Sequence, residues 1–402
     1  MAFEVIPLEP DTVTRPAVIP AAEPYRITLA GKLFQAGHIS IDEAAEIAGI
    51  APTELEAIFM KRGMITRNKI MVCGGAGFIG SNFVHYILEK YPYDDVVVYD
   101  KLTYAGNLEN LRNAERSHRY SFYQGDIADA EYLDEVIRKE HPDFIVNFAA
   151  ETHVTRSLMF RADEFLRTNV IGTHTLLEAV RTNEHIKRLV HVSTDEVYGT
   201  LELGEDRKFF ETDPFEPNVP YSAAKAGGDL LARAYRHSYG ARVIVTHCTN
   251  NYGPFQHPEK LIPNALFRAL RNKPITIHGN GQHVRDWIYV RDHCEALDLI
   301  MRKGKDGDVY NVAANVEKST SEIARTVLRM LGKPEDLMTA VDDRPGNDLR
   351  YSLHINKIKD ELGWEPRTSF EEGIARTIQW YQNNIGWVEA IRERDKEFSK
   401  YI

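Results

Sequence analysis

The chain from Lys69 to about residue 245 alternates short apolar runs with longer amphipathic stretches. Continuous runs rich in Val, Ile and Leu, bounded by turn residues, predict strands that are buried on both faces, as in a parallel sheet. The predicted strands span 69–73, 96–100, 119–123, 143–148, 188–193 and 242–246. The predicted fold class is therefore α/β, a Rossmann-type doubly wound parallel sheet built from right-handed βαβ units.

The alternation is lost on both sides of this region. Beyond about residue 246 the pattern predicts helices at 262–271 and 320–331, while the stretch Asn250–Pro254 predicts a loop. This mixture is typical of a smaller mixed α/β lobe that closes over a substrate. Before the first strand, helices are predicted near 41–48 and 52–60, with a turn between them that suits a helix-turn-helix unit.

These patterns divide the chain into five parts. The predicted parts are a flexible lead (1–24), a small helical extension (25–65), a Rossmann domain (66–245), a mainly substrate-binding lobe (246–390) and a C-terminal tail (391–402). The second helix of the extension carries Glu54 and Glu56, and the extension has no basic stripe to contact phosphates. Docking, oligomerisation or regulation is therefore a better interpretation of the extension than DNA binding.

Charge and cysteine content narrow the class of protein. The 402 residues include 49 Lys and Arg against 59 Asp and Glu, a net charge of −10, which argues against a nucleic-acid or membrane-surface partner. The three cysteines, Cys73, Cys248 and Cys294, are not spaced as a disulfide framework or a metal site. No apolar run approaches the roughly 18 residues of a membrane span, and the N-terminus lacks an export signal. We therefore expect a cytoplasmic enzyme without a metal.

A glycine-rich run, Gly74–Gly80, directly follows the first predicted strand and reads GGAGFIG. Glycines at this point permit a tight turn and the close approach of a pyrophosphate, to which the following helix offers its N–H groups. Asp100 ends the next strand, and a carboxylate there accepts both ribose hydroxyls and repels a 2′-phosphate, which favours NAD over NADP. Lys101 beside it weakens that preference. The cofactor contacts expected here are Gly74, Gly77, Phe78, Ile79, Gly80, Asp100 and Lys101.

The predicted strand 188–193 leads directly into Thr194, Asp195 and Glu196, at the sheet edge where open α/β folds bind ligands. Further along, Tyr221 precedes Lys225 by four residues at the start of a predicted helix, so both side chains share one helical face. An ammonium group there is expected to lower the pKa of the phenol and make it a proton acceptor near neutrality. These five residues are the predicted catalytic set.

Several phrases resemble the extended short-chain dehydrogenase/reductase superfamily, and more narrowly its nucleotide-sugar 4,6-dehydratases. The resemblance extends from residue 69 to about 385. The phrases are Gly74–Gly80, Asp100–Gly106, Asn147–Val154, Ser193–Gly199, Asn218–Ser222, Asn250–Pro254, Pro258–Pro263, Val284–Trp287 and Arg344–Asp348. Because epimerases of the same fold need no acid and base at C5 and C6 of the sugar, the adjacent carboxyls of Asp195 and Glu196 favour a dehydratase.

The resemblance implies an NAD-dependent lyase of deoxysugar biosynthesis, with dTDP-glucose expected first and another nucleotide-hexose second. Tyr221 would take the proton of the 4-hydroxyl as NAD takes the C4 hydride, Lys225 would hold the nicotinamide ribose, and Thr194 would bind the 4-oxygen. Glu196 would remove the C5 proton and Asp195 would protonate the departing C6 oxygen. Return of the hydride to C6 would give a 4-keto-6-deoxy sugar. The two carboxyls need opposite protonation states.

Supporting roles also follow from the resemblance alone. Asp126 and Ile127 would contact the adenine, and Ala149 and Ala150 would line the cofactor cleft. The implied substrate contacts are His153, Thr194, Asn251, Lys260, Leu261, His278, Arg285, Asn347 and Arg350. The chain has His278 where the family usually has Tyr, and Asn347 where it usually has His. In the family these loops face the base, so the two changes bear on the choice of nucleotide.

The alternatives are a 4-epimerase of the same fold, a dehydratase of a different nucleotide sugar and, more remotely, an NAD-sensing regulator. A degenerate sensor is disfavoured because Tyr221 and Lys225 are both present. The resemblance also implies a homodimer, in which helices near 163–182 and 222–238 pair with their copies in a four-helix bundle. The apolar positions that form either this face or the core face of each helix are Leu166, Val170, Leu176, Leu230 and Leu231.

Overall fold

The computed structural model describes residues 23–36, 38–153, 157–158, 162–343 and 346–394. The chain divides into two compact units, one ending at Arg67 and the other beginning at Asn68. Its first helix, α1 (Glu23–Gln35), begins inside the segment predicted as a flexible lead, and the rest of that lead lies outside the described residues.

The first unit packs α1 against α2 (Ile41–Ala48) and α3 (Pro52–Lys61). Ser40 and Glu43 cap α2 reciprocally, and Gly49 ends it with a φ of 75°, a conformation that glycine adopts without strain. Its core consists of alanines and larger apolar side chains: Ile27, Ala30, Ala44, Ala45, Ala48, Leu55, Phe59 and Ile65. The unit therefore has a hydrophobic core of its own.

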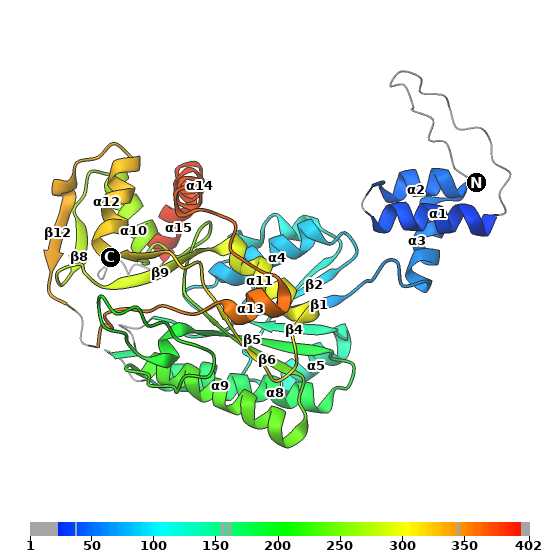
Figure 1. Cartoon of the computed structure of the whole chain (residues 1–402), viewed down its shortest axis with the longest axis horizontal. Coiled ribbons are helices and arrows are strands. Elements are labelled where there is room, and N and C mark those ends of the chain that lie inside the picture. The colour runs from blue at the N-terminus through cyan, green and yellow to red at the C-terminus, as the bar shows by residue number, and fades with distance from the viewer. Residues whose placement is uncertain (1–22, 37, 154–156, 159–161, 344–345, 395–402) are drawn as a thin grey trace, which may run out of the picture. The chain divides into compact units, whose positions relative to one another are not determined.

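The second unit contains a seven-stranded sheet in the order β10-β6-β5-β4-β1-β2-β3, with all neighbouring strands parallel (Figure 1). The strands are β1 (Lys69–Cys73), β2 (Asp95–Asp100), β3 (Tyr120–Gln124), β4 (Phe144–Asn147), β5 (Arg188–Thr194), β6 (Val243–Cys248) and β10 (Val309–Val312). The predicted doubly wound sheet is thereby confirmed, and its seventh strand, β10, is one that the hydrophobic pattern did not reveal.

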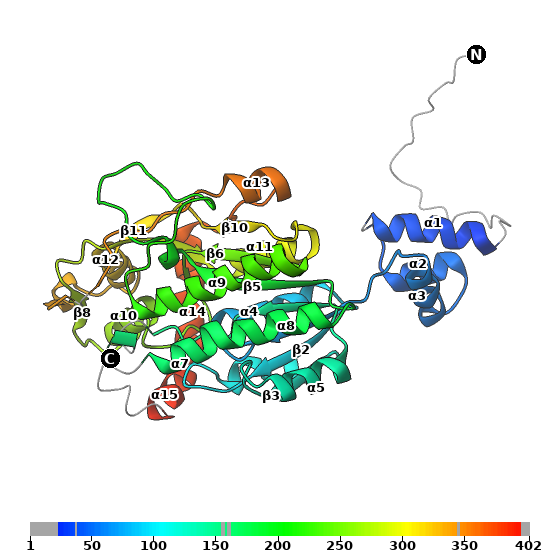
Figure 2. The same ribbon diagram turned by 90° about the horizontal axis from the view of Figure 1, so that it is seen from below.

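Helices cover both faces of the sheet (Figures 1 and 2), and the residues of β1 alternate between the two cores that lie under them. Ile70 and Val72 of β1 belong to the core under α4 (Phe78–Lys90) and α11 (Val290–Lys303). Met71 and Cys73 belong to the opposite core. That second core lies under α5 (Ala130–Glu140), α8 (Thr173–Thr182) and α9 (Pro220–Tyr239). The order of the strands across the sheet reverses between β1 and β4, and open α/β sheets bind ligands at the carboxyl ends of the strands at such a point.

A smaller region beyond β6 contains two short sheets and several helices packed on a third core. One sheet joins β7 (Asn250–Tyr252), β9 (Val284–Tyr289) and β11 (Glu317–Ser319), and the other pairs β8 (Ile275–His278) with β12 (Met338–Val341). The helices here are α10 (Leu261–Leu270), α12 (Thr320–Met330), α13 (Asn356–Leu362), α14 (Phe370–Asn383) and α15 (Ile385–Arg394).

Two local predictions for this region were wrong. Residues 250–252, predicted as part of a loop, form strand β7, because their backbone pairs with β9 despite a polar sequence. The predicted C-terminal tail begins inside α15, since Val388 and Ile391 are buried and hold the helix to the core. The remainder of that tail, residues 395–402, lies outside the described residues.

Candidate active site

Strand β5 delivers a hydroxyl and two carboxyls to the carboxyl edge of the sheet. Thr194 is its last residue, and the short helix η4 (Asp195–Tyr198) starts immediately after it. The Thr194 hydroxyl oxygen caps this helix by accepting a hydrogen bond from the Glu196 backbone N–H at 3.3 Å. The same hydroxyl donates to Oδ1 of Asp195 at 3.2 Å. One polar side chain therefore orients both acidic residues.

Helix α9 brings a tyrosine and a lysine to the same edge. Tyr221 and Lys225 lie in its first two turns, and both side chains are buried. The Lys225 ammonium donates to the Val192 carbonyl of β5 at 2.8 Å, which ties the helix to the strand. The five predicted catalytic residues together line one cavity of about 280 Å³, hereafter the catalytic cavity. Its walls include Gly74, Gly77, Phe78, Ile79, Gly80, Ala150, Thr194, Asp195, Glu196, Tyr221, Lys225 and Asn251.

The two adjacent carboxyls have different environments. Asp195 is buried, and among the described residues its Oδ2 has no hydrogen-bond partner. Burial, together with the neighbouring Glu196 carboxylate, raises the pKa of Asp195 well above its ordinary value. Glu196 faces the adjoining cavity as well as the catalytic one. Asp195 is thus suited to hold a proton that it can donate, while Glu196 is placed where it can take one.

The expected effect of Lys225 on Tyr221 is corrected by the structure. Burial, followed by the charge of Glu196, raises the pKa of the Tyr221 phenol well above its usual value, and a hydrogen bond with Thr194 acts in the opposite direction. Burial also lowers the pKa of Lys225, against the favourable charge of Asp229. The phenol is therefore protonated unless another group of the site takes its proton.

A buried polar cluster lies behind the catalytic strand. The Asp229 carboxylate accepts from the Ser193 hydroxyl at 2.7 Å and lies 3.2 Å from Nε2 of His247 and 3.4 Å from Nε2 of His191. Burial opposes its ionisation, but the two histidines outweigh that effect and lower the pKa of Asp229. Because Asp229 follows Lys225 by one helical turn, its charge compensates the buried ammonium.

The glycine-rich turn forms a cradle with no room for a side chain. A Cβ on Gly74 would lie 2.5 Å from the Ala149 backbone nitrogen, and one on Gly80 would lie 2.2 Å from the Gly74 carbonyl oxygen. Gly74 also has a φ of 76°. The Asp100 carboxylate accepts from the backbone N–H groups of Ala76 and Leu102 at 2.9 and 2.8 Å, which fixes it at the end of β2.

A smaller pocket continues from the cradle along the carboxyl ends of β1, β2, β3 and β4. It is lined by Gly74, Gly77, Asp100, Lys101, Asp126, Ile127, Ala149 and Ala150 among others. The Lys101 ammonium lies 3.1 Å from Asp126 Oδ2, which Arg167 also approaches at 3.3 Å. Because the Lys101 ammonium pairs with Asp126, its positive charge does little to weaken the preference for NAD over NADP that Asp100 gives. The cradle, the ribose-side carboxylate and the slot beyond them fit an NAD-type dinucleotide, as the sequence predicted.

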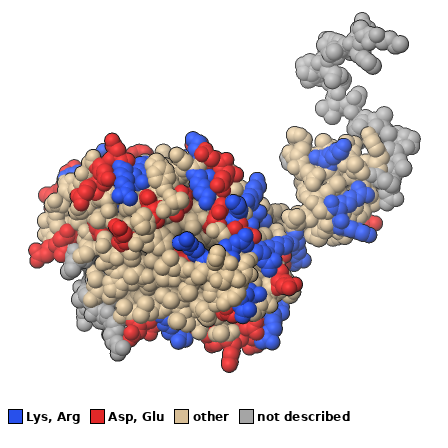
Figure 3. Space-filling model, turned by 60° about the horizontal axis from the view of Figure 1, so that its bottom comes forward, with Lys and Arg blue, Asp and Glu red and all other residues tan. Residues whose placement is uncertain are grey.

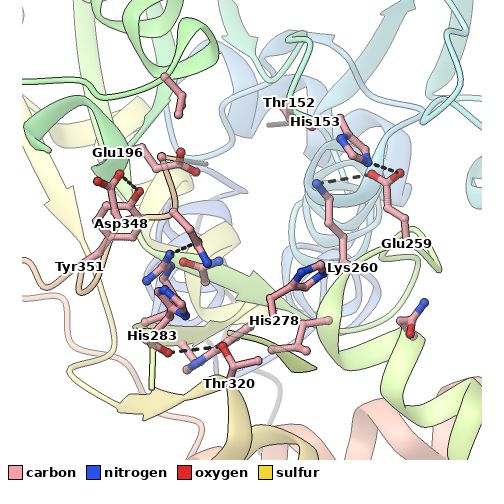
Figure 4. Close-up of a pocket in the computed structure, with 18 of the residues that line it drawn as sticks. Thr152, His153, Glu196, Glu259, Lys260, His278, His283, Thr320, Asp348 and Tyr351 are labelled. Atoms are coloured by element: carbon pink, nitrogen blue, oxygen red, sulfur yellow. Dashed lines mark hydrogen bonds and ion pairs between the residues drawn. The ribbon is translucent and has the colours of Figure 1, made fainter. Parts of the chain in front are cut away.

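A second cavity of about 300 Å³ adjoins the catalytic one and shares Glu196 with it (Figure 4). Figure 4 shows Glu196 on one side of this cavity, with His153 and Lys260 across from it. It is lined by six of the predicted substrate residues, His153, Lys260, Leu261, His278, Arg285 and Asn347. The Arg285 guanidinium lies 4.3 Å from the centre of the Tyr351 ring and donates to Asn347 Oδ1 at 3.3 Å. This cavity is hereafter the substrate cavity.

Two other predicted substrate residues lie elsewhere. Asn251 lines the catalytic cavity, where its amide donates to the Thr249 carbonyl at 3.0 Å. The Arg350 guanidinium is held by Glu317 at 2.6 and 2.9 Å and does not line the substrate cavity. Its pKa is raised by that same pair. In the described structure Arg350 pairs with Glu317 of β11, and its contact with the substrate stays a prediction.

Sequence reasoning missed Glu259, which faces both cavities. Its carboxylate lies 3.4 Å from His153 and 3.4 Å from Lys260, and it accepts from the Tyr104 hydroxyl at 3.3 Å. Burial opposes its ionisation, but Lys260 and the nearby histidines outweigh that effect and lower its pKa. Glu259 belongs to the phrase Pro258–Pro263, which carries part of the family resemblance. That position could have identified it, but only Lys260 and Leu261 of this phrase were predicted to contact the substrate.

Among the described residues, no group of three or more His, Cys, Asp or Glu side chains is arranged to hold a metal ion. In that same part of the chain, none of the helices is both long enough and apolar enough to span a membrane.

Comparisons with known proteins agree with this geometry. A family model described as GDP-mannose 4,6 dehydratase matches residues 71–377. The dTDP-glucose 4,6-dehydratase of Xanthomonas campestris pv. campestris is 46% identical over 338 residues, covering 80% of this chain and 95% of that protein.

Solved structures resemble the chain as well. A dTDP-glucose 4,6-dehydratase from Bacillus anthracis in complex with NAD is 45% identical, with a TM-score of 0.76 and coverage of 81% of this chain and 99% of that one. A UDP-glucose 4-epimerase from Thermotoga maritima, solved with UDP-glucose, is 29% identical, with a TM-score of 0.71 and coverage of 79% and 99%.

Replacing Gly80 by alanine should weaken NAD binding. The added methyl group would collide with the Gly74 carbonyl and push the cradle open, an overpacking cost of about 1–3 kcal/mol or roughly 10- to 100-fold in affinity. Isothermal titration calorimetry with NAD measures the change. Gly386→Ala is the matched control, since nothing lies within 4 Å of its added Cβ. Equal affinities for the two variants would contradict this view of the cradle.

Replacing Asp195 by asparagine should stabilise the fold at neutral pH. Because the folded pKa of Asp195 lies above its unfolded value, this carboxyl destabilises the protein increasingly as the pH rises through and beyond the unfolded pKa. Removing it should raise the free energy of unfolding at pH 7 by about 1–3 kcal/mol, the cost of a buried unsatisfied polar group. The gain should vanish near pH 4.

Urea unfolding of Asp195→Asn at the two pH values checks this expectation, with the exposed Asp360→Asn as control. A variant less stable than the wild type at pH 7 would show that the Asp195 carboxylate is stabilised by contacts in the fold.

Proposed function

The chain belongs to the nucleotide-sugar 4,6-dehydratases of the extended short-chain dehydrogenase/reductase superfamily, and from that premise we propose that it dehydrates dTDP-glucose to dTDP-4-keto-6-deoxyglucose with NAD as cofactor. The observation that carries the proposal is the pair Asp195 and Glu196. Two adjacent carboxyls share one cavity with Tyr221 and Lys225, and burial raises the pKa of one of them, Asp195, well above its ordinary value. Elimination of water from C5 and C6 needs such an acid and base.

The residues divide the proton transfers between them. Tyr221 takes the proton of the 4-hydroxyl, and Thr194 binds the 4-oxygen. The ketone at C4 makes the C5 proton acidic, so that Glu196 removes it while Asp195 protonates the leaving C6 hydroxyl. Bound NAD supplies the redox chemistry, accepting a hydride from C4 and returning it to C6. Lys225, whose ammonium donates to the Val192 carbonyl, would hold the nicotinamide ribose of the bound cofactor.

The substrate cavity supports a diphosphate substrate. Arg285 and Lys260 place a guanidinium and an ammonium on its wall, and arginine suits phosphate because two of its N–H groups can bind two oxygens. His278 and Asn347 line the same cavity and are proposed to face the base, with His153 and Leu261 as further contacts. The dTDP relatives, at 46% identity, make dTDP the first nucleotide to test.

A 4-epimerase remains the alternative function, because the chain shares its fold with UDP-glucose 4-epimerases at 29% identity. That reaction needs the Tyr221 and Lys225 pair but no acid and base at C5 and C6. The Asp195 and Glu196 pair therefore favours the dehydratase over the epimerase. A sensor without turnover has no use for these carboxyls at all.

The first test is product mass after incubation with NAD and, in separate reactions, dTDP-, UDP-, GDP- and CDP-glucose and UDP-N-acetylglucosamine. We expect dTDP-glucose to lose one water. Glu196→Gln should lower the rate at least ~10²-fold, the contribution typical of a positioned base. Glu202→Gln, on an exposed loop, should retain the wild-type rate. An unchanged mass with an epimerised sugar would replace the proposal by the epimerase, and loss of water from another nucleotide sugar would replace dTDP.

We further propose a homodimer built on α8, α9 and the residues just before α8. Of the five apolar positions named above, Leu166 and Leu230 are exposed, Val170 and Leu231 are half-buried, and Leu176 belongs to the core of its own subunit. Ile171 and Leu230 are 51% and 52% exposed, unusual for side chains of this size. The face that carries α8 and α9 shows few charged side chains at its centre (Figures 2 and 3). An exposed apolar face of this kind is typical of an interface.

Replacing Ile171 and Leu230 together by glutamate should convert the dimer to a monomer, because two carboxylates would be buried against their copies. Sedimentation velocity measures the change. Leu203→Glu, on an exposed loop, should leave the assembly intact. A wild-type protein that sediments as a monomer, or a double variant that stays dimeric, would contradict this interface.

A cytoplasmic location is likewise a proposal. Cys73, Cys248 and Cys294 are free and buried, which is compatible with a reducing compartment.

A further inference from the structure

The catalytic cavity and the substrate cavity share one stretch of wall. Six residues line both cavities: Thr152, Glu196, Asn250, Gln256, Glu259 and Lys260. Figure 4 shows Glu259 and Lys260 on the opposite side of the substrate cavity from Glu196. In the proposed reaction C4, C5 and C6 of the hexose face the catalytic residues, while the diphosphate on C1 lies in the substrate cavity. The two remaining carbons that bear hydroxyls, C2 and C3, therefore lie along the shared wall.

Two side chains of this wall each carry an oxygen that makes no hydrogen bond. Glu259 Oε2 and Gln256 Oε1 are both buried, and neither has a hydrogen-bond partner among the described residues. A buried acceptor without a partner costs free energy that a donor group can recover. The two oxygens therefore favour a ligand that brings hydrogen-bond donors to this wall.

One oxygen of the Glu259 carboxylate is engaged and the other is not. Oε1 accepts from the Tyr104 hydroxyl at 3.3 Å and lies 3.4 Å from the Lys260 ammonium. Oε2 lies 3.4 Å from His153 Nε2 and 3.7 Å from His257 Nδ1, but receives a hydrogen bond from neither. His257 Nδ1 accepts from the Glu259 backbone N–H at 3.3 Å, so its lone pair points at that group. Although burial opposes its ionisation, the pKa of Glu259 is lowered, chiefly by Lys260, so the carboxylate can only accept.

The Gln256 amide is oriented by its own hydrogen bond. Its Nε2 donates to the Asn251 carbonyl at 2.9 Å, a contact that only the nitrogen of the amide can make. Oε1 is therefore the acceptor that remains. The loop around it is also held, because the Tyr381 hydroxyl donates to the Gln256 carbonyl. The terminal torsions of Glu and Gln side chains are broad, so a small rotation turns either unpartnered oxygen towards the cavities.

The hexose has two hydroxyls that the catalytic residues do not use. In the proposed reaction the 4-hydroxyl is bound by Tyr221 and Thr194, and the 6-hydroxyl leaves with the proton of Asp195. The 2- and 3-hydroxyls remain as donors. The sugar thus has two uncommitted donors where the protein has two buried, unpartnered acceptors.

The neighbours of each acceptor assign it to one hydroxyl. Glu259 contacts Lys260, which is proposed to bind the diphosphate, and C2 is the ring carbon next to the one that carries the diphosphate. Gln256 contacts Asn251, which lines the catalytic cavity but not the substrate cavity. C3 is the ring carbon next to the one that is oxidised there.

We propose that Glu259 and Gln256 form a subsite for the hexose hydroxyls, in which Glu259 accepts from the 2-hydroxyl and Gln256 accepts from the 3-hydroxyl. The inference rests on the proposed dehydratase function and names the substrate class more closely. The substrate is a nucleotide hexose with free hydroxyls at both C2 and C3. A 2-acetamido sugar lacks the first of these hydroxyls and brings a larger group to a buried wall, so it binds more weakly.

The test is a double-mutant cycle between the protein and the sugar. Isothermal titration calorimetry on the NAD-loaded protein measures Kd for dTDP-glucose, dTDP-2-deoxyglucose and dTDP-3-deoxyglucose, or for the same three sugars on the nucleotide that the product-mass assay identifies. Every protein in the cycle carries Tyr221→Phe, which removes the base that starts the reaction, so the sugars stay unchanged during the titration. Glu259→Leu and Gln256→Met each remove one acceptor at similar size.

In the parent protein, loss of the 2-hydroxyl should weaken binding by roughly 10- to 10²-fold, because its acceptor is charged, and loss of the 3-hydroxyl by roughly 2- to 10-fold. Glu259→Leu should bind dTDP-glucose and the 2-deoxy sugar equally while it keeps the 3-deoxy penalty. Gln256→Met should show the reverse. Glu202→Leu and Gln382→Met, whose side chains are exposed, are the matched controls and should keep both penalties.

A purely structural role for either residue would weaken the binding of all three sugars by the same factor and leave both Kd ratios at the parent value. That result overturns the subsite, and so does a variant in which both penalties vanish. Glu259→Ala and Gln256→Leu replace any variant whose melting curve or NAD affinity shows that it has not folded. Failure of the wild type to dehydrate a sugar that it binds overturns the proposed function alone, because the Kd ratios are measured without turnover.

Discussion

The active site depends on one buried contact between a helix and a strand. The Lys225 ammonium of α9 donates to the Val192 carbonyl of β5, and one turn further along α9 Asp229 accepts from Ser193 and lies against two histidines. A buried ammonium and a buried carboxylate each cost several kcal/mol unless they are compensated, so these contacts hold the first turns of α9 against β5. The same turns carry Tyr221 into the cavity that Thr194 also lines. The fold and the chemistry are therefore fixed by the same bonds.

Much of the fold follows from the sequence because a strand buried on both faces is mostly apolar. The runs Ile70–Cys73 and Leu189–Val190 carry this signal, and the strands that contain them were predicted closely. β7 was not predicted, since Asn250 and Asn251 are polar and owe their extended conformation to a neighbouring strand. The predicted boundary at residue 391 falls inside α15 for a related reason. The helix continues there because its buried side chains pack on a core formed by distant parts of the chain.

Some residues of the candidate site could likewise be predicted from local sequence, and others depend on distant parts of the chain. Gly74, Gly80 and Asp100 can be recognised from the sequence because their roles depend on backbone shape at the end of a strand, which local spacing determines. Arg350 could not be placed, because its distant partner Glu317 determines where the guanidinium points. The pKa of Tyr221 could not be foreseen either. Local spacing reveals that Lys225 is near, but only the three-dimensional structure reveals how completely the phenol is buried beside Glu196.

The helical unit before Arg67 has its own core and its own reciprocal cap at Ser40 and Glu43. The matched relatives correspond to about 80% of this chain, and the family model matches residues 71–377, which lie within the second unit. In evolutionary terms, a segment that completes its own core can be acquired by gene fusion without redesign of the enzyme that follows it. Selection can then change the exposed residues of α1 and α3 for a new purpose while the catalytic residues are conserved for the old one.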